Sequence, residues 1–523
     1  MQRVGIWRVA ELTLEADRRH SNPLYDVVVE ARLRGPGGRE RRVEGFWDGG
    51  KTWRVRFAPD AAGEWHYDIV CRKGADPGLD GRSGVVQCVA GEPDAALFRY
   101  GPVAVSPDGR HLIHADGTPF FWLADAAWNG VLKAKLSDWK AYLRTRREQG
   151  FTAVMFVLTH WRAFLGDALG ERAYTGAGPI QVNPGFFARL DAKVEAVNRE
   201  GLLAAPVLLW AIAAPDDRNP GYSLPEDDAV ALARYMVARY GAYQVAWLLG
   251  GDGDYEGEKA ERWRRIGRRV FGDGHDRPVT MHPRGVQWVG VEFRREEWFD
   301  FIGYQSGHGD SRDHLAWLTQ GPPATDWDTP PVRPVINLEP NYEYHVSYHS
   351  RQRFTDYHVR RALYWSLLVS PTAGVTYGHH GVWPWMEEHA VPPDHPSSGE
   401  APPWHEALHS PGSISVRHLR SFFNGIEWWR LRPAPELLLA QPGGHDPAEF
   451  VAVGATAERD LVVAYLPRAG EIGLAGREMP EAFQARWYDP AEGTWAEAVD
   501  LGEGWLRFRA AGERDRVLLL EGV

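Results

Sequence analysis

The chain has 523 residues, more than one hydrophobic core accommodates, so we expect two or three domains. Its formal net charge is -11, from 59 basic and 70 acidic residues, which argues against nucleic acid or an anionic membrane as the main partner. The two cysteines, Cys71 and Cys88, are too few for a disulfide scaffold or a cysteine-based zinc site, and whether they pair is left open.

The N-terminus, Met1 to Trp7, shows no apolar stretch followed by a cleavage site, and no run reaches the length of a transmembrane helix. We therefore expect no membrane partner and, by default, a cytoplasmic location. Secretion of a trimmed precursor remains the alternative.

Residues 1–92 alternate apolar and polar side chains in short runs such as 25–31, 52–57 and 64–70, separated by turn residues. This alternation is typical of an antiparallel β-sandwich. No catalytic constellation falls here, so a structural or ancillary sugar-binding role is expected.

Residues 93–430 alternate apolar strands with amphipathic helices in eight rounds, which predicts a (β/α)8 barrel as the catalytic domain. The expected strands are 119–124, 151–158, 203–210, 244–250, 278–282, 300–304, 333–338 and 373–377. The expected helices are 136–149, 184–200, 225–240, 258–270, 356–369 and 415–429, with a short, poorly defined helix between the fifth and sixth strands.

Residues 431–523 return to short alternating runs, among them 460–466 and 484–489, with turns at Gly470 and Gly493. This pattern predicts a second β-sandwich. The predicted fold is thus a central TIM barrel flanked by two β-sandwich domains.

The tips of parallel strands in a barrel converge on one mouth, so the residues that end each strand become neighbours. Here they are polar or aromatic at nearly every strand, which suits a neutral polyol: hydrogen-bond partners at the rim of a sugar and flat indole surfaces beneath it. The expected substrate-binding residues are Asp125, Trp128, His160, Trp161, Trp210, His282, Gln305, Tyr342, Tyr377, His379, His380 and Trp383.

Asp252 and Glu339 end the fourth and seventh strands, which face each other across a barrel mouth. Most glycosidases cleave the glycosidic bond with two such carboxyl groups. The two groups are about 5 Å apart in retaining enzymes and several Å further apart in inverting ones. Taken singly, Asp252 could cap a turn and Glu339 could pair with Arg333. Their joint position among sugar-binding side chains favours catalysis.

Two alternatives compete at these tips. Asp125 could cap the segment that begins at Ala126 as readily as bind sugar. Asp125, His160, His282 and His379 could also hold a metal ion in a metal-dependent hydrolase. No HxH or HExxH spacing occurs at the tips, so we expect neither a metal nor another cofactor.

Several of these segments resemble the apiosidase-like glycoside hydrolases (family 140 and relatives). The similarity lies in 121–128, 247–252, Glu339-Pro340 and 376–383. The N-terminal residues 45–49 and 56–59 resemble the small β domain that often precedes that barrel, and 485–490 the collagen-binding-type β domain that often follows it. Gly253 stands where members often carry a basic residue, so the sugar is not fixed by the resemblance.

The resemblance implies a retaining glycosidase in which Asp252 is the general acid/base and Glu339 the nucleophile. We expect it to cleave a glycosidic bond, with furanosides among the candidates, in a plant or microbial polysaccharide or oligosaccharide. A catalytically inactive sugar-binding barrel and the metal-dependent hydrolase are the alternatives. The sequence gives no oligomeric state.

Overall fold

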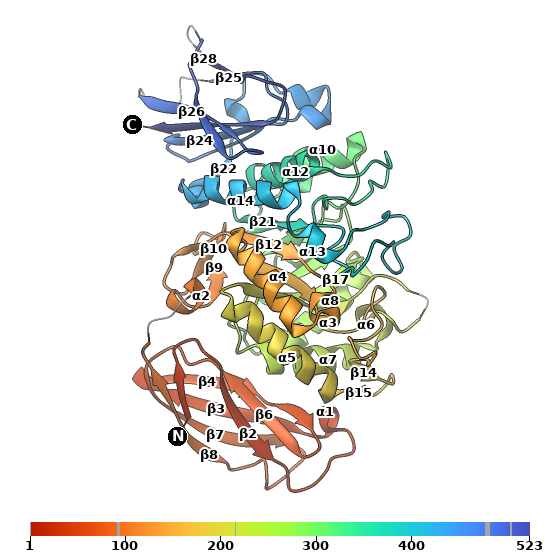
Figure 1. Ribbon diagram of the computed structural model, residues 1–523. Helices are drawn as coiled ribbons and strands as arrows, with labels where there is room; N and C mark the ends of the chain where they lie inside the picture. Colours follow the sequence, from red (N-terminus) through yellow and green to blue (C-terminus); the bar gives the residue numbers. More distant parts are fainter. Residues whose placement is uncertain (1, 92–94, 215, 476–481, 503–504, 523) are drawn as a thin grey trace.

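The computed structural model describes residues 2–91, 95–214, 216–475, 482–502 and 505–522. In these residues a (β/α)8 barrel lies between two β structures, one at each end of the molecule, which are antiparallel apart from the parallel pair β1–β8 (Figure 1). The predicted fold class is confirmed, although the expected boundary between residues 92 and 93 lies outside the described residues. In the described part of the chain, no helix is both long and apolar enough to cross a bilayer.

The N-terminal sandwich combines a sheet in the order β1-β8-β7-β3-β4 with a second sheet, β2-β6-β5. Alternate side chains of the two sheets share one core, which includes Val29, Val55 and Trp65. Cys71 and Cys88 lie here as free thiols. The strands are β1 (Gln2–Gly5), β2 (Ala10–Glu15), β3 (Val28–Gly35), β4 (Arg39–Glu44), β5 (Phe46–Gly49), β6 (Thr52–Phe57), β7 (Gly63–Lys73) and β8 (Ser83–Val89).

The run 25–31, which was expected to be a strand of the N-terminal sandwich, starts before the strand that the structure shows. Residues 25 and 26 belong to a short helix, α1 (Pro23–Asp26), and β3 starts at Val28. Pro23 occupies the first helical position, where its fixed φ favours the turn. The Asp26 carboxylate accepts a 2.7 Å hydrogen bond from the Asn22 backbone N–H, which closes this turn.

The barrel sheet runs in the order β18-β17-β16-β13-β12-β21-β20-β19, and its paired strands are parallel. The gap between β18 and β19 is bridged by Thr280, whose hydroxyl donates to Phe301 O at 2.6 Å and accepts from Gly303 N at 3.0 Å. The strands are β12 (Trp122–Ala126), β13 (Ala153–Val157), β16 (Leu203–Trp210), β17 (Trp247–Gly253), β18 (Val279–Pro283), β19 (Ile302–Tyr304), β20 (Val335–Asn337) and β21 (Gly374–Gly378).

The barrel strands are buried almost throughout, as expected of a parallel sheet covered by helices. A small sheet of β9 (Val103–Val105), β10 (Leu112–His114) and β11 (Pro119–Phe120) precedes the barrel and takes up the start of the first expected strand. As a result the first barrel strand begins at Trp122 rather than at residue 119.

The larger helices are α4 (Leu136–Glu148), α5 (Pro184–Arg199), α7 (Glu226–Tyr240), α8 (Glu258–Phe271), α10 (Arg312–Gln320), α12 (Asp356–Leu368) and α14 (Pro411–Asn424). Those that were predicted begin and end within a few residues of their ranges, except that the last one covers 411–424 rather than 415–429; α10 was not predicted. The short ones are α2 (Ala96–Arg99), α3 (Gly130–Lys133), α6 (Pro220–Ser223), α9 (Gly290–Phe293), α11 (Pro322–Thr325) and α13 (Trp404–Ala407).

The C-terminal β structure consists of a sheet in the order β22-β23-β24-β29-β26-β27 and a pair, β25-β28. Its strands are β22 (Arg432–Pro433), β23 (Ala452–Ala455), β24 (Leu461–Leu466), β25 (Glu471–Leu474), β26 (Phe483–Asp489), β27 (Thr494–Glu497), β28 (Leu506–Arg509) and β29 (Arg516–Gly522).

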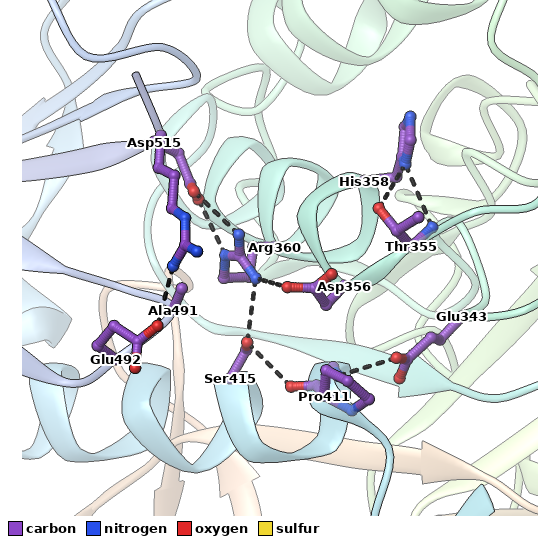
Figure 2. A network of polar contacts seen from close by, with 12 residues as sticks. Glu343, Thr355, Asp356, His358, Arg360, Pro411, Ser415, Ala491, Glu492 and Asp515 are labelled. Atoms are coloured by element: carbon purple, nitrogen blue, oxygen red, sulfur yellow. Dashed lines mark hydrogen bonds and ion pairs between the residues drawn. The ribbon is translucent and has the colours of Figure 1, made fainter. Parts of the chain in front are cut away.

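A buried ion pair joins this structure to the barrel. Arg360 of α12 donates two hydrogen bonds of 3.0 Å to the Asp515 carboxylate and one of 3.2 Å to the Ser415 hydroxyl of α14 (Figure 2). The side chains of Arg360 and Asp515 are 4% and 0% exposed. Arg360 also pairs with Asp356 of the same helix, so loss of Asp515 would leave the buried guanidinium with that one carboxylate.

Candidate active site

A cleft of about 430 Å³ opens where the ends of the barrel strands meet the loops that follow them. Its size is at the lower end of the ~300–1,000 Å³ typical of small-molecule sites. The lining residues are Trp128, Trp161, Arg162, Trp210, Ile212, Asp252, Gly285, Val286, Gln305, Gly307, His308, His314, Glu339, Tyr342, His345, Tyr348, His349, Trp383 and His395. Asp252 and Glu339 therefore share one cavity.

Glu339 follows β20 by two residues and is 8% exposed. His308 Nε2 lies 3.0 Å from its Oε1, and His282 Nε2 lies 3.3 Å from its Oε2. Both imidazoles accept a backbone N–H at Nδ1, from Tyr342 and Asp252 respectively, each at 3.4 Å. This places the ring proton on each Nε2, facing the carboxylate.

These contacts hold Glu339 in its ionised form. Burial by itself raises the pKa of this carboxyl, but the hydrogen bonds and charges of His282 and His308 outweigh burial and lower the pKa well below its usual range. Glu339 is thus a buried, ionised carboxylate that needs no proton loss before it can act as a nucleophile.

Asp252 is the residue before the last one of β17 and is partly exposed to the cleft. Its φ of +48° is unusual for a residue other than glycine, and the pairing of β17 with β18 slips around it, between Leu248 and Gly251 and again before Gly253. Such irregular backbone is characteristic of strand ends that aim a functional side chain.

Asp252 has the opposite protonation tendency to Glu339. Burial is the largest cause and the negative charge of Glu339 the second, and together they raise the pKa of Asp252 to about 7. The electrostatic effects of Arg162, His282 and Arg284 act against this rise. At neutral pH a substantial share of Asp252 therefore carries a proton that it can donate.

Four tryptophans line the cleft. The ring centroids of Trp161 and Trp210 are 4.3 Å apart, those of Trp128 and Trp210 are 5.5 Å apart, and those of Trp161 and Trp383 are 6.2 Å apart. They come from the loops or ends after β12, β13, β16 and β21. The four indoles meet in tilted and edge contacts and form an aromatic wall of the cleft, and such a wall suits the apolar face of a sugar ring.

Polar atoms that find no partner among the described residues also gather around the cleft. In this part of the chain, buried atoms that make no hydrogen bond include Trp210 Nε1, Gln305 Oε1 and Arg162 Nε. Unsatisfied groups of this kind are uncommon inside folded proteins, and hydroxyl groups of a bound sugar would satisfy both donors and acceptors. The cleft is therefore suited to a polyhydroxylated ligand.

Asp125 does not reach the cleft, which corrects the expectation that it binds sugar. It is 0% exposed and points toward α4, where Tyr142 donates at 2.6 Å and Arg146 Nε donates at 2.6 Å. Side chains within a strand point alternately to the two faces of the sheet. Asp125 lies within β12 rather than beyond its end, and its side chain points outward, away from the barrel axis. Its place is a buried ion pair.

Five other expected substrate-binding residues do not line the cleft, and this also corrects the prediction; one of them, His282, contacts the Glu339 carboxylate instead. Tyr377 donates to Glu343 Oε2 at 2.6 Å, and His379 Nδ1 accepts from Gly381 N at 3.0 Å. His380 Nδ1 accepts from Trp383 Nε1 at 3.2 Å, so it supports a cleft residue. His160 packs against Tyr174, with ring centroids 4.8 Å apart.

The ligand set of the metal-dependent alternative does not assemble. Among the described residues, no group of three or more His, Cys, Asp or Glu side chains is placed to hold a metal ion. Asp125 pairs with Arg146, His160 lies against Tyr174, and His282 faces Glu339.

Several cleft residues were not expected from the sequence. One of them, His314, belongs to α10, and the others come from loops: Arg162, Ile212, Gly285, Val286, Gly307, His308, His345, Tyr348, His349 and His395. One signal was available: the loop after β20 carries a dense run of His and Tyr between 342 and 349. His395 lies in the proline-rich loop after β21, where no pattern marks it.

Two family models match the chain. The model described as the apiosidase-like catalytic domain matches residues 106–430, which include every residue of the cleft. A domain of unknown function, DUF5060, matches residues 3–72 of the N-terminal sandwich.

Solved structures with the same fold include a glycoside hydrolase that is 21% identical, with a TM-score of 0.70 over 82% of this chain and 99% of that one. A family 5 glycoside hydrolase from Bacteroides vulgatus ATCC 8482 is 21% identical, with a TM-score of 0.72 over 82% of this chain and 95% of its own. A further Bacteroides vulgatus structure, described as a candidate glycoside hydrolase, is 18% identical with a TM-score of 0.71, and the match covers 100% of both chains. A search of curated proteins gives no match.

Proposed function

Because this chain belongs to the family of apiosidase-like catalytic domains and is a glycosidase, we propose that it hydrolyses its substrate by double displacement with retention of anomeric configuration. Asp252 is the general acid/base and Glu339 the nucleophile. The substrate is a plant or microbial oligosaccharide or polysaccharide, cleaved at a terminal sugar. The small volume of the cleft supports a single sugar unit as the part that enters it.

One observation carries this proposal: two carboxyl groups in one cleft have pKa values moved in opposite directions, that of Asp252 up to about 7 and that of Glu339 down. When the pKa values of two neighbouring carboxyl groups are moved apart, the group with the higher pKa can act as the proton donor and the group with the lower pKa as the nucleophile. At neutral pH a substantial share of Asp252 is protonated, whereas Glu339 is ionised.

In the first step, Asp252 donates its proton to the glycosidic oxygen while the bond from that oxygen to the anomeric carbon breaks. A Glu339 oxygen attacks the same carbon and forms a glycosyl ester. His282 and His308 release part of their hydrogen bonding as negative charge leaves the carboxylate. The aromatic wall holds the sugar ring in place during the transfer.

In the second step, Asp252 is a carboxylate and takes a proton from water as the water oxygen attacks the anomeric carbon. The ester bond to Glu339 breaks, which returns Glu339 to its ionised form and Asp252 to its protonated form. The negative charge that reappears on Glu339 again favours the protonated state of Asp252.

The experiment is a screen of 4-nitrophenyl furanosides and pyranosides with the wild type, Asp252→Asn, Glu339→Gln and a control, Asp254→Asn. Asp254 lies two residues away, in an ion pair with Lys259, outside the cleft lining. We expect a loss of about 10³-fold or more in kcat/KM for the first two variants and none for the control. Near-normal turnover by either variant would overturn the residue assignment.

Proton NMR tests the stereochemistry, because it identifies the anomer of the sugar product that appears first. Retention is expected, and inversion would remove the glycosyl ester from the mechanism. If the wild type binds sugars but cleaves none of the panel, the chain is instead a sugar-binding barrel.

A further inference from the structure

The loop after β13, residues 158–183, connects the cleft to the outside of the barrel. Near its start it carries Trp161 and Arg162 into the cleft. It then runs outward and returns through a short hairpin of β14 (Tyr174–Thr175) and β15 (Gln181–Val182). In Figure 1 this hairpin lies near α1 of the N-terminal sandwich.

The outer end of the hairpin is attached to the N-terminal sandwich by two hydrogen bonds. Asn22 Nδ2 donates to Ile180 O at 2.9 Å, and Ile180 N donates to the Tyr25 hydroxyl at 3.3 Å. The two residues of the sandwich thus satisfy both backbone groups of Ile180.

The same tyrosine reaches the barrel. The Tyr25 hydroxyl donates to Asp228 Oδ1 on α7, and the other oxygen of Asp228 accepts from Gly178 N at 2.6 Å. Asp228 is 2% exposed, so its carboxylate depends on these partners. Burial and the hydrogen bond to Asp228 both raise the pKa of Tyr25, which keeps the hydroxyl protonated as a donor. Tyr25 therefore joins the sandwich, the hairpin and α7 at one point.

From the hairpin a short series of contacts leads back to the cleft. Asn183 N donates to Ala173 O at 2.8 Å, and Ala173 N donates to His160 Nδ1 at 3.4 Å. The Tyr174 ring packs on His160, the residue directly before Trp161. Trp161 itself is fixed by its Nε1–H, which donates to Asn129 Oδ1 at 2.6 Å.

We propose that Tyr25 is a positioning residue for the substrate-binding loop. The N-terminal sandwich thereby takes part in substrate binding without touching the substrate. This inference rests on the proposed function, because it assigns Trp161 and Arg162 to the substrate. Long loops keep one conformation only where backbone groups find partners outside the loop, and Tyr25 supplies such a partner at the hairpin.

The first test compares Tyr25→Phe with Tyr67→Phe. Tyr67 belongs to β7 of the same sandwich, and within the described residues its hydroxyl makes no hydrogen bond. Hydrogen exchange of the substrate-free enzyme should accelerate about 5- to 10-fold across 158–183 in Tyr25→Phe and remain unchanged in Tyr67→Phe. Unchanged exchange in Tyr25→Phe would overturn the proposal.

The second test is kinetic. We expect Tyr25→Phe to raise KM about 3- to 10-fold and to leave kcat within about twofold, because the loop binds the sugar but holds neither carboxyl group. In a double-mutant cycle with Trp161→Phe, the effects on KM should be less than additive if Tyr25 acts through Trp161. Additive effects, or a fall in kcat alone, would contradict the inference.

The two proposals fail separately. Absence of glycosidase activity in the wild type would refute the proposed function, whereas the exchange measurement needs no substrate and still reports whether Tyr25 holds the loop.

Discussion

The pH dependence of kcat/KM tests whether Asp252 is the proton donor. Burial and the charge of Glu339 raise the pKa of Asp252 to about 7, against an ordinary value of 3.8. The first step requires the protonated form, so the rate should fall above pH 7 with a slope of one log unit per pH unit. At pH 9 this amounts to a loss of about 100-fold from the plateau.

Below pH 7, kcat/KM should change little with pH. His282 and His308 lower the pKa of Glu339 below its ordinary value of 4.5, so protonation of the nucleophile does not limit the rate near pH 5. We expect a plateau from about pH 5 to 6.5 and a fall only on the alkaline side. This is the profile of a glycosidase whose acid titrates near neutrality and whose nucleophile does not titrate in the working range.

The assay is the initial rate of hydrolysis of an aryl glycoside at substrate concentrations well below KM, between pH 4 and 10. Each sample is returned to pH 6.5 afterwards, so that irreversible inactivation is separated from titration. Asp252→Asn provides the control: with a dinitrophenyl leaving group, which needs no proton, its first step should be independent of pH between 6 and 9. A wild-type rate that stays level or rises from pH 7 to 9 would refute the reasoning.

Three further predictions concern stability and binding. Asp252→Asn should raise the melting temperature at pH 8 but not at pH 4. The pKa of Asp252 is higher in the folded state than in the unfolded state, so this carboxyl group destabilises the fold progressively as pH rises from 3.8 to about 7. An equal change in melting temperature at both pH values would contradict this. Asp515→Ala should lower the free energy of unfolding by about 3 kcal/mol in a denaturant titration, since the buried Arg360 keeps only Asp356 as a carboxylate partner and the Tyr465 hydroxyl loses its acceptor. By contrast, Glu492→Ala, which removes an exposed partner of Arg514, should change it by less than about 1 kcal/mol. Trp383→Leu should raise KM about tenfold with little change in kcat, because it removes a stacking face and neither carboxyl; an unchanged KM would place the sugar elsewhere.

Much of the fold could be predicted from the sequence because it depends on local patterns. The apolar runs that became β17 and β20, and the helical periods that became α4 and α5, are set by which side chains must be buried. Asp252 and Glu339 could be located for the same reason: each follows a buried run, and parallel strands end at a common mouth. These features need no knowledge of the neighbouring elements.

The direction of single side chains needed the tertiary structure. Asp125 and Tyr377 lie beside each other in the β12–β21 register, and both point outward, to Arg146 and Glu343. A shift of one residue along a strand reverses inward and outward, and no local pattern in a fully buried strand fixes that parity.

The protonation states also depended on residues far apart in the chain. His282 lies in β18 and His308 in the loop after β19, and the fold brings both to Glu339, whose charge in turn raises the pKa of Asp252. Interaction between charges depends on distance and burial, which are properties of the folded molecule. The sequence by itself predicted that these two carboxyl groups meet, and only the tertiary structure supplied the burial and the neighbouring charges that move their pKa values in opposite directions.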